Sequence, residues 1–143
     1  MTDATILHRS LAADPLMRTM VWVLQLALAG VFLYTGVLHV FGAEMPVFLR
    51  LVGIAELIGA VGLIVPAATR ILPSLTALAA CGLTMIMTAA TVHHFSRDEL
   101  APQALITIAL GTLTAFVAWS RLIAAPVTPR GHTHPPSLRP HHH

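Results

Sequence analysis

The sequence contains no lysine and few charged residues of any kind. Only 10% of its 143 residues are charged, its eight basic residues are all arginine, and 56% of its residues are hydrophobic. The surface of a soluble domain is about 25–35% Lys, Arg, Glu and Asp. The scarcity of charge therefore argues against a soluble protein and predicts an integral membrane protein whose first partner is the lipid bilayer, with no nucleic-acid partner.

Cysteine is nearly absent as well. The single residue Cys81 can form no disulfide within the chain, and there is no Cys-x-x-Cys redox pair.

His132 and His134 lie in a Pro- and His-rich tail that cannot pack a core, and an isolated pair of this kind does not predict a metal site. The last three histidines are compatible with a native end or an expression tag, so they carry no functional argument.

Four apolar segments are long enough to cross a bilayer, which takes roughly 20 residues each. Their connections are short and contain or adjoin proline, so consecutive helices must run antiparallel. We predict an all-α fold, a four-transmembrane-helix antiparallel (up-and-down) bundle. The expected spans are residues 20–41, 46–65, 71–92 and 103–124, with prolines 46, 66, 73 and 102 at or near helix ends.

The distribution of arginine predicts the orientation of the bundle. Six arginines fall on the side of the two termini and two, Arg50 and Arg97, on the other, which places both termini in the cytoplasm. The first apolar run is too long for a signal peptide. We therefore expect a multi-pass protein of the cytoplasmic (inner) membrane, with a cytoplasmic segment 1–19, a membrane domain 20–125 and a disordered tail 126–143.

Glu56 lies in the middle of the apolar stretch "LVGIAELIGAVGLIVP". An ionisable group at the centre of the bilayer faces the bundle interior and marks function by default, although a neutral acid bonding two helices is the structural alternative. Tyr34 lies at a similar depth, and we expect its hydroxyl to be the partner of the carboxyl group. His39 lies nearer the outer interface, and it is either a helix-end contact or the third residue of a polar cavity opening outward.

Threonines on the third and fourth spans form two further polar stripes. Thr84, Thr88 and Thr91 share one helix face, and Thr107 and Thr114 share another. Such stripes are more often packing surfaces than ligand sites, because the hydroxyls can bond carbonyls of their own helix. His93 is either a helix cap or a ligand contact. The candidate ligand-binding residues are Glu56, Tyr34, His39, Thr84, Thr88, His93 and Thr114.

Small residues on the second span suggest a further contact. The surfaces Gly53/Ala60 and Gly59/Gly62 would allow the close approach of another protomer, so a homo-oligomer is expected.

Three stretches carry a resemblance to a known family. The segments "GVFLYTGVLHVFG", "GIAELIGAVGLIVP" and "TAATVHHFSRDE", together with Trp119 and Arg121, resemble the DoxX-like family of small membrane proteins over residues 20–123. Gly53-x-x-Glu56-x-x-Gly59 is the most specific piece. Family members commonly carry Lys where this chain has His39, so a permanent cation is replaced by a group that titrates near neutrality.

The resemblance implies a role near quinone-coupled redox chemistry, because the family is named after a membrane subunit linked to sulfur-compound oxidation at the expense of quinone. The first hypothesis is a membrane partner that binds a lipophilic molecule such as quinone or docks a redox protein. The second is a membrane-embedded acid–base enzyme of the isomerase type, with Glu56, Tyr34 and His39 as catalytic residues. A proton or solute carrier and a haem ligated by His39 or His93 are weaker alternatives. The sequence does not decide whether the protein is an enzyme.

Overall fold

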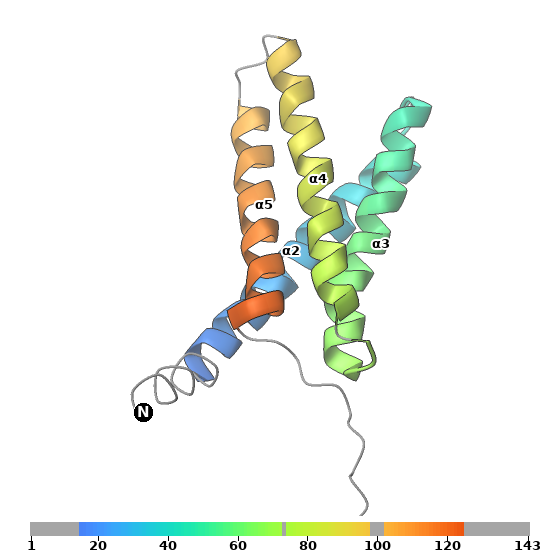
Figure 1. The fold of residues 1–143 in the computed structure, drawn as a ribbon. Helices are drawn as coiled ribbons and strands as arrows, with labels where there is room; N and C mark the ends of the chain where they lie inside the picture. The colour runs from blue at the N-terminus through green and yellow to red at the C-terminus, as the bar shows by residue number, and fades with distance from the viewer. Residues whose placement is uncertain (1–14, 73, 98–101, 125–143) are drawn as a thin grey trace, which may run out of the picture.

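A computed structural model describes residues 15–72, 74–97 and 102–124. These residues form four long helices, α2 (Pro15–Phe41), α3 (Val47–Thr69), α4 (Ser74–Ser96) and α5 (Pro102–Trp119), and a π-helical turn η1 (Ser120–Ala124) continues α5 (Figure 1). All four helices are long and apolar enough to cross a membrane, α5 together with its extension. The predicted all-α, four-helix architecture is confirmed. The expected cytoplasmic segment before Pro15 and the tail with His132 and His134 lie outside the described residues.

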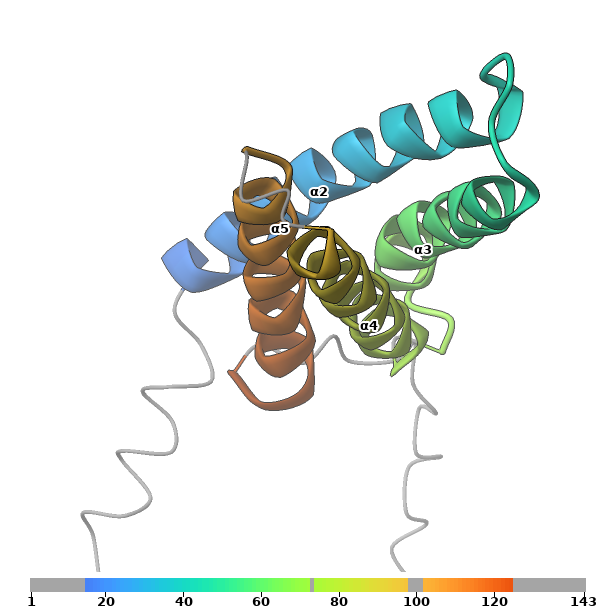
Figure 2. The ribbon, with the colours of Figure 1, turned by 90° about the horizontal axis from the view of Figure 1, so that it is seen from above.

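The helices form two antiparallel hairpins, α2–α3 and α4–α5, which meet along α3 and α4. Seen from above, α3, α4 and α5 stand in a row and α2 runs obliquely along one side of that row (Figure 2). The start of α2 reaches the end of α5, whereas its other end stays with α3 (Figure 1). The bundle therefore has one end where both hairpins meet and another where they diverge.

The helix boundaries differ from the predicted ones mainly by extension. Helix α2 begins at Pro15, five residues before the expected start, because proline is well suited to the first turn of a helix. Helix α3 continues through Pro66 to Thr69 and ends at Arg70, which has a left-handed φ of 58°. Pro66 thus lies inside the last turns of the helix and does not terminate it at Val65.

Glycine contacts hold the helices close together. A Cβ on Gly59 would lie 2.6 Å from a methyl carbon of Leu83, and one on Gly62 would lie 2.7 Å from Cβ of Ala79, so both glycines are covered by α4. Gly53 is covered by α2 in the same way, and Ala60 is buried in the core of this chain. The surfaces that suggested a second protomer are therefore occupied by helices of the same chain, so they do not support a homo-oligomer, which stays a prediction.

Candidate functional site

One face of α2 organises the polar interior of the bundle. Its residues follow each other at alternating intervals of four and three, which places them on a single helix stripe. The middle of the stripe is apolar and its two ends are polar. The stripe consists of Arg18, Trp22, Gln25, Ala29, Phe32, Gly36 and His39. We call the two ends of the bundle the His39 end and the Arg121 end, since Arg121 of η1 lies beside the start of α2.

At the His39 end, the carboxyl group of Glu56 pairs with a histidine. Nδ1 of His39 and Oε2 of Glu56 lie 2.8 Å apart. Glu56 is only 3% exposed, so the prediction that it faces the bundle interior is confirmed. The side chain of His39 is 29% exposed. The pair therefore joins a buried acid to an imidazole that can be reached from outside the bundle.

Tyr34 is not the partner of Glu56, and that prediction was wrong. Its side chain is 67% exposed on the surface of α2. Five residues separate Tyr34 from His39, which at 3.6 residues per turn rotates the two side chains about 140° apart. We expected Tyr34 to be the partner because it lies at about the depth of Glu56 in the membrane. The side chain of His39 points towards α3 and that of Tyr34 does not, so His39 makes the contact.

The two glycines that precede the pair explain how it forms. Gly36 and Gly53 each stand three residues before one member of the pair. A Cβ on Gly53 would lie 2.7 Å from Cβ of His39 and 2.9 Å from the carbonyl oxygen of Gly36. The two backbones can approach this closely only because neither residue has a side chain. The motif Gly53-x-x-Glu56-x-x-Gly59 thus contains a glycine that brings α2 against the acid.

The arrangement is suited to proton exchange. The contact with Glu56 orients the imidazole ring of His39 through Nδ1, and no hydrogen bond to Nε2 is found among the described residues. Such an Nε2 accepts a hydrogen bond when the imidazole is neutral and donates one when it is protonated. The pair can therefore offer either function to a molecule that reaches the His39 end.

The Arg121 end holds a second polar cluster that sequence reasoning missed. Nε of Arg121 donates to Oε1 of Gln25 at 2.8 Å, and Nε2 of Gln25 donates to the carbonyl oxygen of Leu63. The guanidinium group lies over the ring of Trp22, 5.1 Å from its centroid. Gln25 is completely buried. The signal was present, because an amide in the middle of an apolar span must find a hydrogen-bond partner.

The threonine stripes meet each other between α4 and α5. Thr84 donates to Thr114 at 3.0 Å, and Thr91 donates to Thr107 at 2.8 Å, so two hydroxyl bridges join the helices. The same hydroxyls also lie 2.8 Å from carbonyl oxygens of their own helix, as the packing interpretation predicted; since a hydroxyl has one hydrogen, each donates either to that carbonyl or across the contact.

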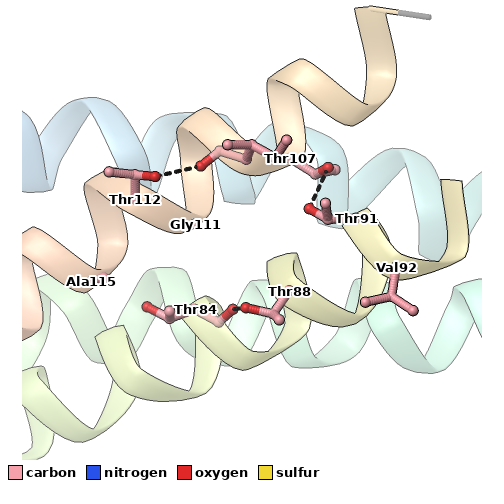
Figure 3. A pocket seen from close by; sticks show the side chains of 9 residues that line it. Thr84, Thr88, Thr91, Val92, Thr107, Gly111, Thr112 and Ala115 are labelled. Atoms are coloured by element: carbon pink, nitrogen blue, oxygen red, sulfur yellow. Dashed lines mark hydrogen bonds between the residues drawn. The ribbon is translucent and has the colours of Figure 1, made fainter. Parts of the chain in front are cut away.

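A groove of about 440 Å³ lies along this contact. Figure 3 shows its walls. It is lined by Thr84, Thr88, Thr91, Val92, Thr107, Ile108, Gly111, Thr112 and Ala115. The groove does not include Glu56, Tyr34 or His39, so the predicted ligand residues fall into separate places. A similar depth in the membrane does not show that the threonines and Glu56 line the same cavity.

His93 lies in the last turn of α4, exposed, with its ring edge-on to that of His94 at 6.1 Å. Among the described residues no group of three or more His, Cys, Asp or Glu is placed to hold a metal ion. Haem ligation by His39 or His93 and ligand contacts by Thr88 and Thr114 stay predictions.

Comparison with known proteins supports the resemblance found in the sequence. The model of the DoxX-like family matches residues 45–117, which include α3, α4 and most of α5. No curated protein and no solved structure matches the chain. The matched segment contains Glu56, both neighbouring glycines of its motif and the threonine bridges. Because the match covers just over half of the sequence, the chain belongs to the DoxX-like family of membrane proteins.

Proposed function

We propose that this protein binds a small lipophilic molecule with an oxygen-bearing head group, of the quinone class, at the His39–Glu56 pair, as the membrane component of a redox system. The observation that carries the proposal is the 2.8 Å contact between a buried carboxyl group and a partly exposed imidazole. Ionisable groups inside a membrane span are costly and are retained where they serve a function.

The chemistry of the pair matches both forms of a quinone. The carbonyl oxygen of a quinone accepts a hydrogen bond, which Nε2–H of a protonated His39 can donate. The hydroxyl group of a quinol donates one, which Nε2 of a neutral His39 can accept. Glu56 fixes the ring orientation in both cases. A single residue can thus bind either form and exchange a proton with it, while the electrons come from a partner redox protein.

The position of the pair suits a ligand that arrives through the bilayer. His39 lies near the end of α2, where the two hairpins diverge (Figure 1). Val37, Leu38 and Phe41 beside it are exposed apolar side chains against which a hydrocarbon tail can lie. In the orientation expected from the arginines, this end faces the outer side of the cytoplasmic membrane.

A second candidate, an acid–base enzyme acting on a small apolar substrate, is favoured by the same contact. A histidine oriented by a carboxylate is the usual arrangement of a general base. Such an enzyme would need the proton of the pair during turnover, whereas a binding protein would need only its hydrogen bonds. Glu56→Gln separates these roles, because it keeps the volume and the hydrogen-bonding capacity but removes proton exchange.

Two measurements test the proposed function. Purified protein is first extracted, and its lipids are identified by mass spectrometry and its visible absorption is recorded. We expect a co-purifying quinone and no haem band. Short-chain ubiquinone is then titrated calorimetrically into protein reconstituted in nanodiscs.

In the titration, loss of the hydrogen bond in His39→Leu should weaken binding about tenfold or more. His94→Leu, at the same end of the bundle, is the matched control and should bind as the parent does. Equal affinities for the parent and for His39→Leu would refute quinone binding at this pair. Tight binding that survives Glu56→Gln would show that recognition uses the hydrogen bonds of the pair and does not need the proton of Glu56.

A further inference from the structure

The groove between α4 and α5 takes no part in the function proposed for the His39–Glu56 pair. Its volume of about 440 Å³ is in the range of small-molecule sites, roughly 300–1,000 Å³. Both of its walls belong to helices long and apolar enough to cross the membrane. Thr88, Thr112 and Ala115 on these walls are exposed, so a molecule dissolved in the hydrocarbon can reach them.

Two threonines of the groove are not explained by the packing of α4 against α5. The hydroxyl of Thr88 lies 2.8 Å from the carbonyl oxygen of Thr84, and that of Thr112 lies 2.8 Å from the carbonyl oxygen of Ile108. Within the described part of the chain, neither hydroxyl bonds another helix. Figure 3 shows their side chains on the two walls of the groove. They place polar oxygen atoms at membrane depth on a surface open to lipid.

The hydrogens of the threonines that line the groove are all used inside the protein. A hydroxyl group has one hydrogen and two lone pairs. Thr88, Thr107 and Thr112 donate theirs to carbonyls of their own helices. Thr84 and Thr91 donate theirs to such a carbonyl or across to α5. The threonines therefore offer lone pairs to an occupant of the groove, and the occupant that matches them carries a hydrogen-bond donor.

The length of the groove fits a lipid better than a further helix. Its walls run from Thr84 to Val92 on α4 and from Thr107 to Ala115 on α5, each about 12 Å long at 1.5 Å per residue. A membrane helix crosses about 30 Å of hydrocarbon, so most of its length would lie outside the groove. A second copy of the chain docked by this same face would also bring hydrogen-bond acceptors against acceptors.

We propose that the groove binds a membrane lipid with a free hydroxyl group, a lipid alcohol, which donates its hydrogen to the oxygen atom of Thr88 or Thr112. Its hydrocarbon body lies against Val92, Ile108 and Ala115 on the same walls. A hydrogen bond made away from water is stronger than the same bond made in water, so a single hydroxyl group is enough to select the lipid. The groove is lined by neither member of the His39–Glu56 pair, so the proposal does not depend on what that pair binds.

The test uses the full-length protein in detergent micelles and hexadecanol that carries a photoreactive diazirine in its chain. Unlabelled hexadecanol and hexadecyl methyl ether are the competitors, since the ether keeps the oxygen atom and lacks the hydrogen. We expect labelling of the α4 and α5 peptides that line the groove. The alcohol should prevent this labelling about fivefold more effectively than the ether, the value of one hydrogen bond. Equal competition by the two compounds would overturn the proposal.

Removal of the acceptors should abolish the preference for the alcohol. The double variant Thr88→Val/Thr112→Val should bind hexadecanol about as weakly as the ether, and the two single variants show which oxygen atom accepts. Thr35→Val is the matched control, because the hydroxyl of Thr35 also bonds a carbonyl of its own helix but does not line the groove. A preference for the alcohol that persists in the double variant would show that the hydroxyl group is not recognised by these threonines.

A second pair of variants tests the place of binding. Ala115→Leu should fill the groove and reduce labelling about fivefold or more. Ala109→Leu changes another exposed alanine of α5 that does not line the groove, and it should be labelled as the parent is. Equal labelling of both variants would overturn the site. If the alcohol does not label the groove and Ala115→Leu separates a dimer that the parent forms, the occupant is a second copy of the chain and the proposal is wrong.

Discussion

The two ends of the α2 stripe make the same kind of polar contact, but the two contacts differ in charge. Each end places a polar side chain of α2 against a polar group of another helix, His39 against Glu56 and Gln25 against Arg121. At the His39 end an acid meets a base, so a proton can move and the pair can be neutral as a whole. At the Arg121 end an amide meets a guanidinium group that cannot lose its proton. The first arrangement is suited to proton exchange and the second to a permanent positive charge.

The largest effect should come from breaking the Arg121 end. Gln25→Leu removes the acceptor of Arg121 Nε while the charge of Arg121 stays, so the free energy of unfolding should fall by about 2–3 kcal/mol, the value of a hydrogen bond to a charged group. Reversible unfolding in mixed micelles with SDS measures it. Leu26→Met, on the exposed face one residue further, is the control and should change little. An unchanged stability of Gln25→Leu would mean that the amide does not support Arg121.

Separating the helices at the His39 end should cost somewhat less. The methyl group of Gly53→Ala would meet Cβ of His39 and the carbonyl oxygen of Gly36, and such overpacking costs about 1–3 kcal/mol. The same shift should pull His39 away from Glu56 and weaken ligand binding. Gly30→Ala is the matched control, since a Cβ there meets nothing within 4 Å. If both variants unfold alike, the glycine contact does not set the distance between α2 and α3.

Removing the acid should destabilise less than removing Gln25, and this difference tests the comparison directly. In Glu56→Leu the imidazole of His39 can become neutral, so no buried charge is stranded, and the expected loss is about 1 kcal/mol. The same unfolding assay gives both values. A loss in Glu56→Leu as large as that in Gln25→Leu would show that the His39 end also carries a fixed charge.

The smallest effect is expected at the threonine bridges, which belong to neither end of the stripe. Thr91→Val removes the bond to Thr107, and hydrogen bonds between membrane helices average about 0.6 kcal/mol. A double-mutant cycle with Thr107→Val measures this coupling. Within the described part of the chain, the hydroxyl of Thr112 bonds only a carbonyl of its own helix, so the cycle of Thr91→Val with Thr112→Val should give no coupling. A coupling well above that average would mean that the threonine bridges between α4 and α5 contribute more to the stability of the protein than we expect.

Much of the fold could be predicted from the sequence, because bilayer thickness converts directly into the length of apolar segments. The four spans, their antiparallel order and the interior position of Glu56 follow from this rule and from the cost of a charge in lipid. The helix ends were less certain, as at Pro66, where the loss of one backbone hydrogen bond does not end a membrane helix that stays packed against its neighbours.

The partner of Glu56 and the cluster around Arg121 needed the tertiary structure. Depth in the membrane can be counted along a helix, but rotation about its axis and the angle at which two helices cross depend on every contact between them. The close approach of Gly36 and Gly53 turned His39, and not Tyr34, towards the acid. The oblique path of α2 brought Gln25 to a residue 96 positions away in the sequence. The sequence by itself determined which polar groups had to be buried, because water is absent from the hydrocarbon, and only the packing of the helices decided which groups they meet.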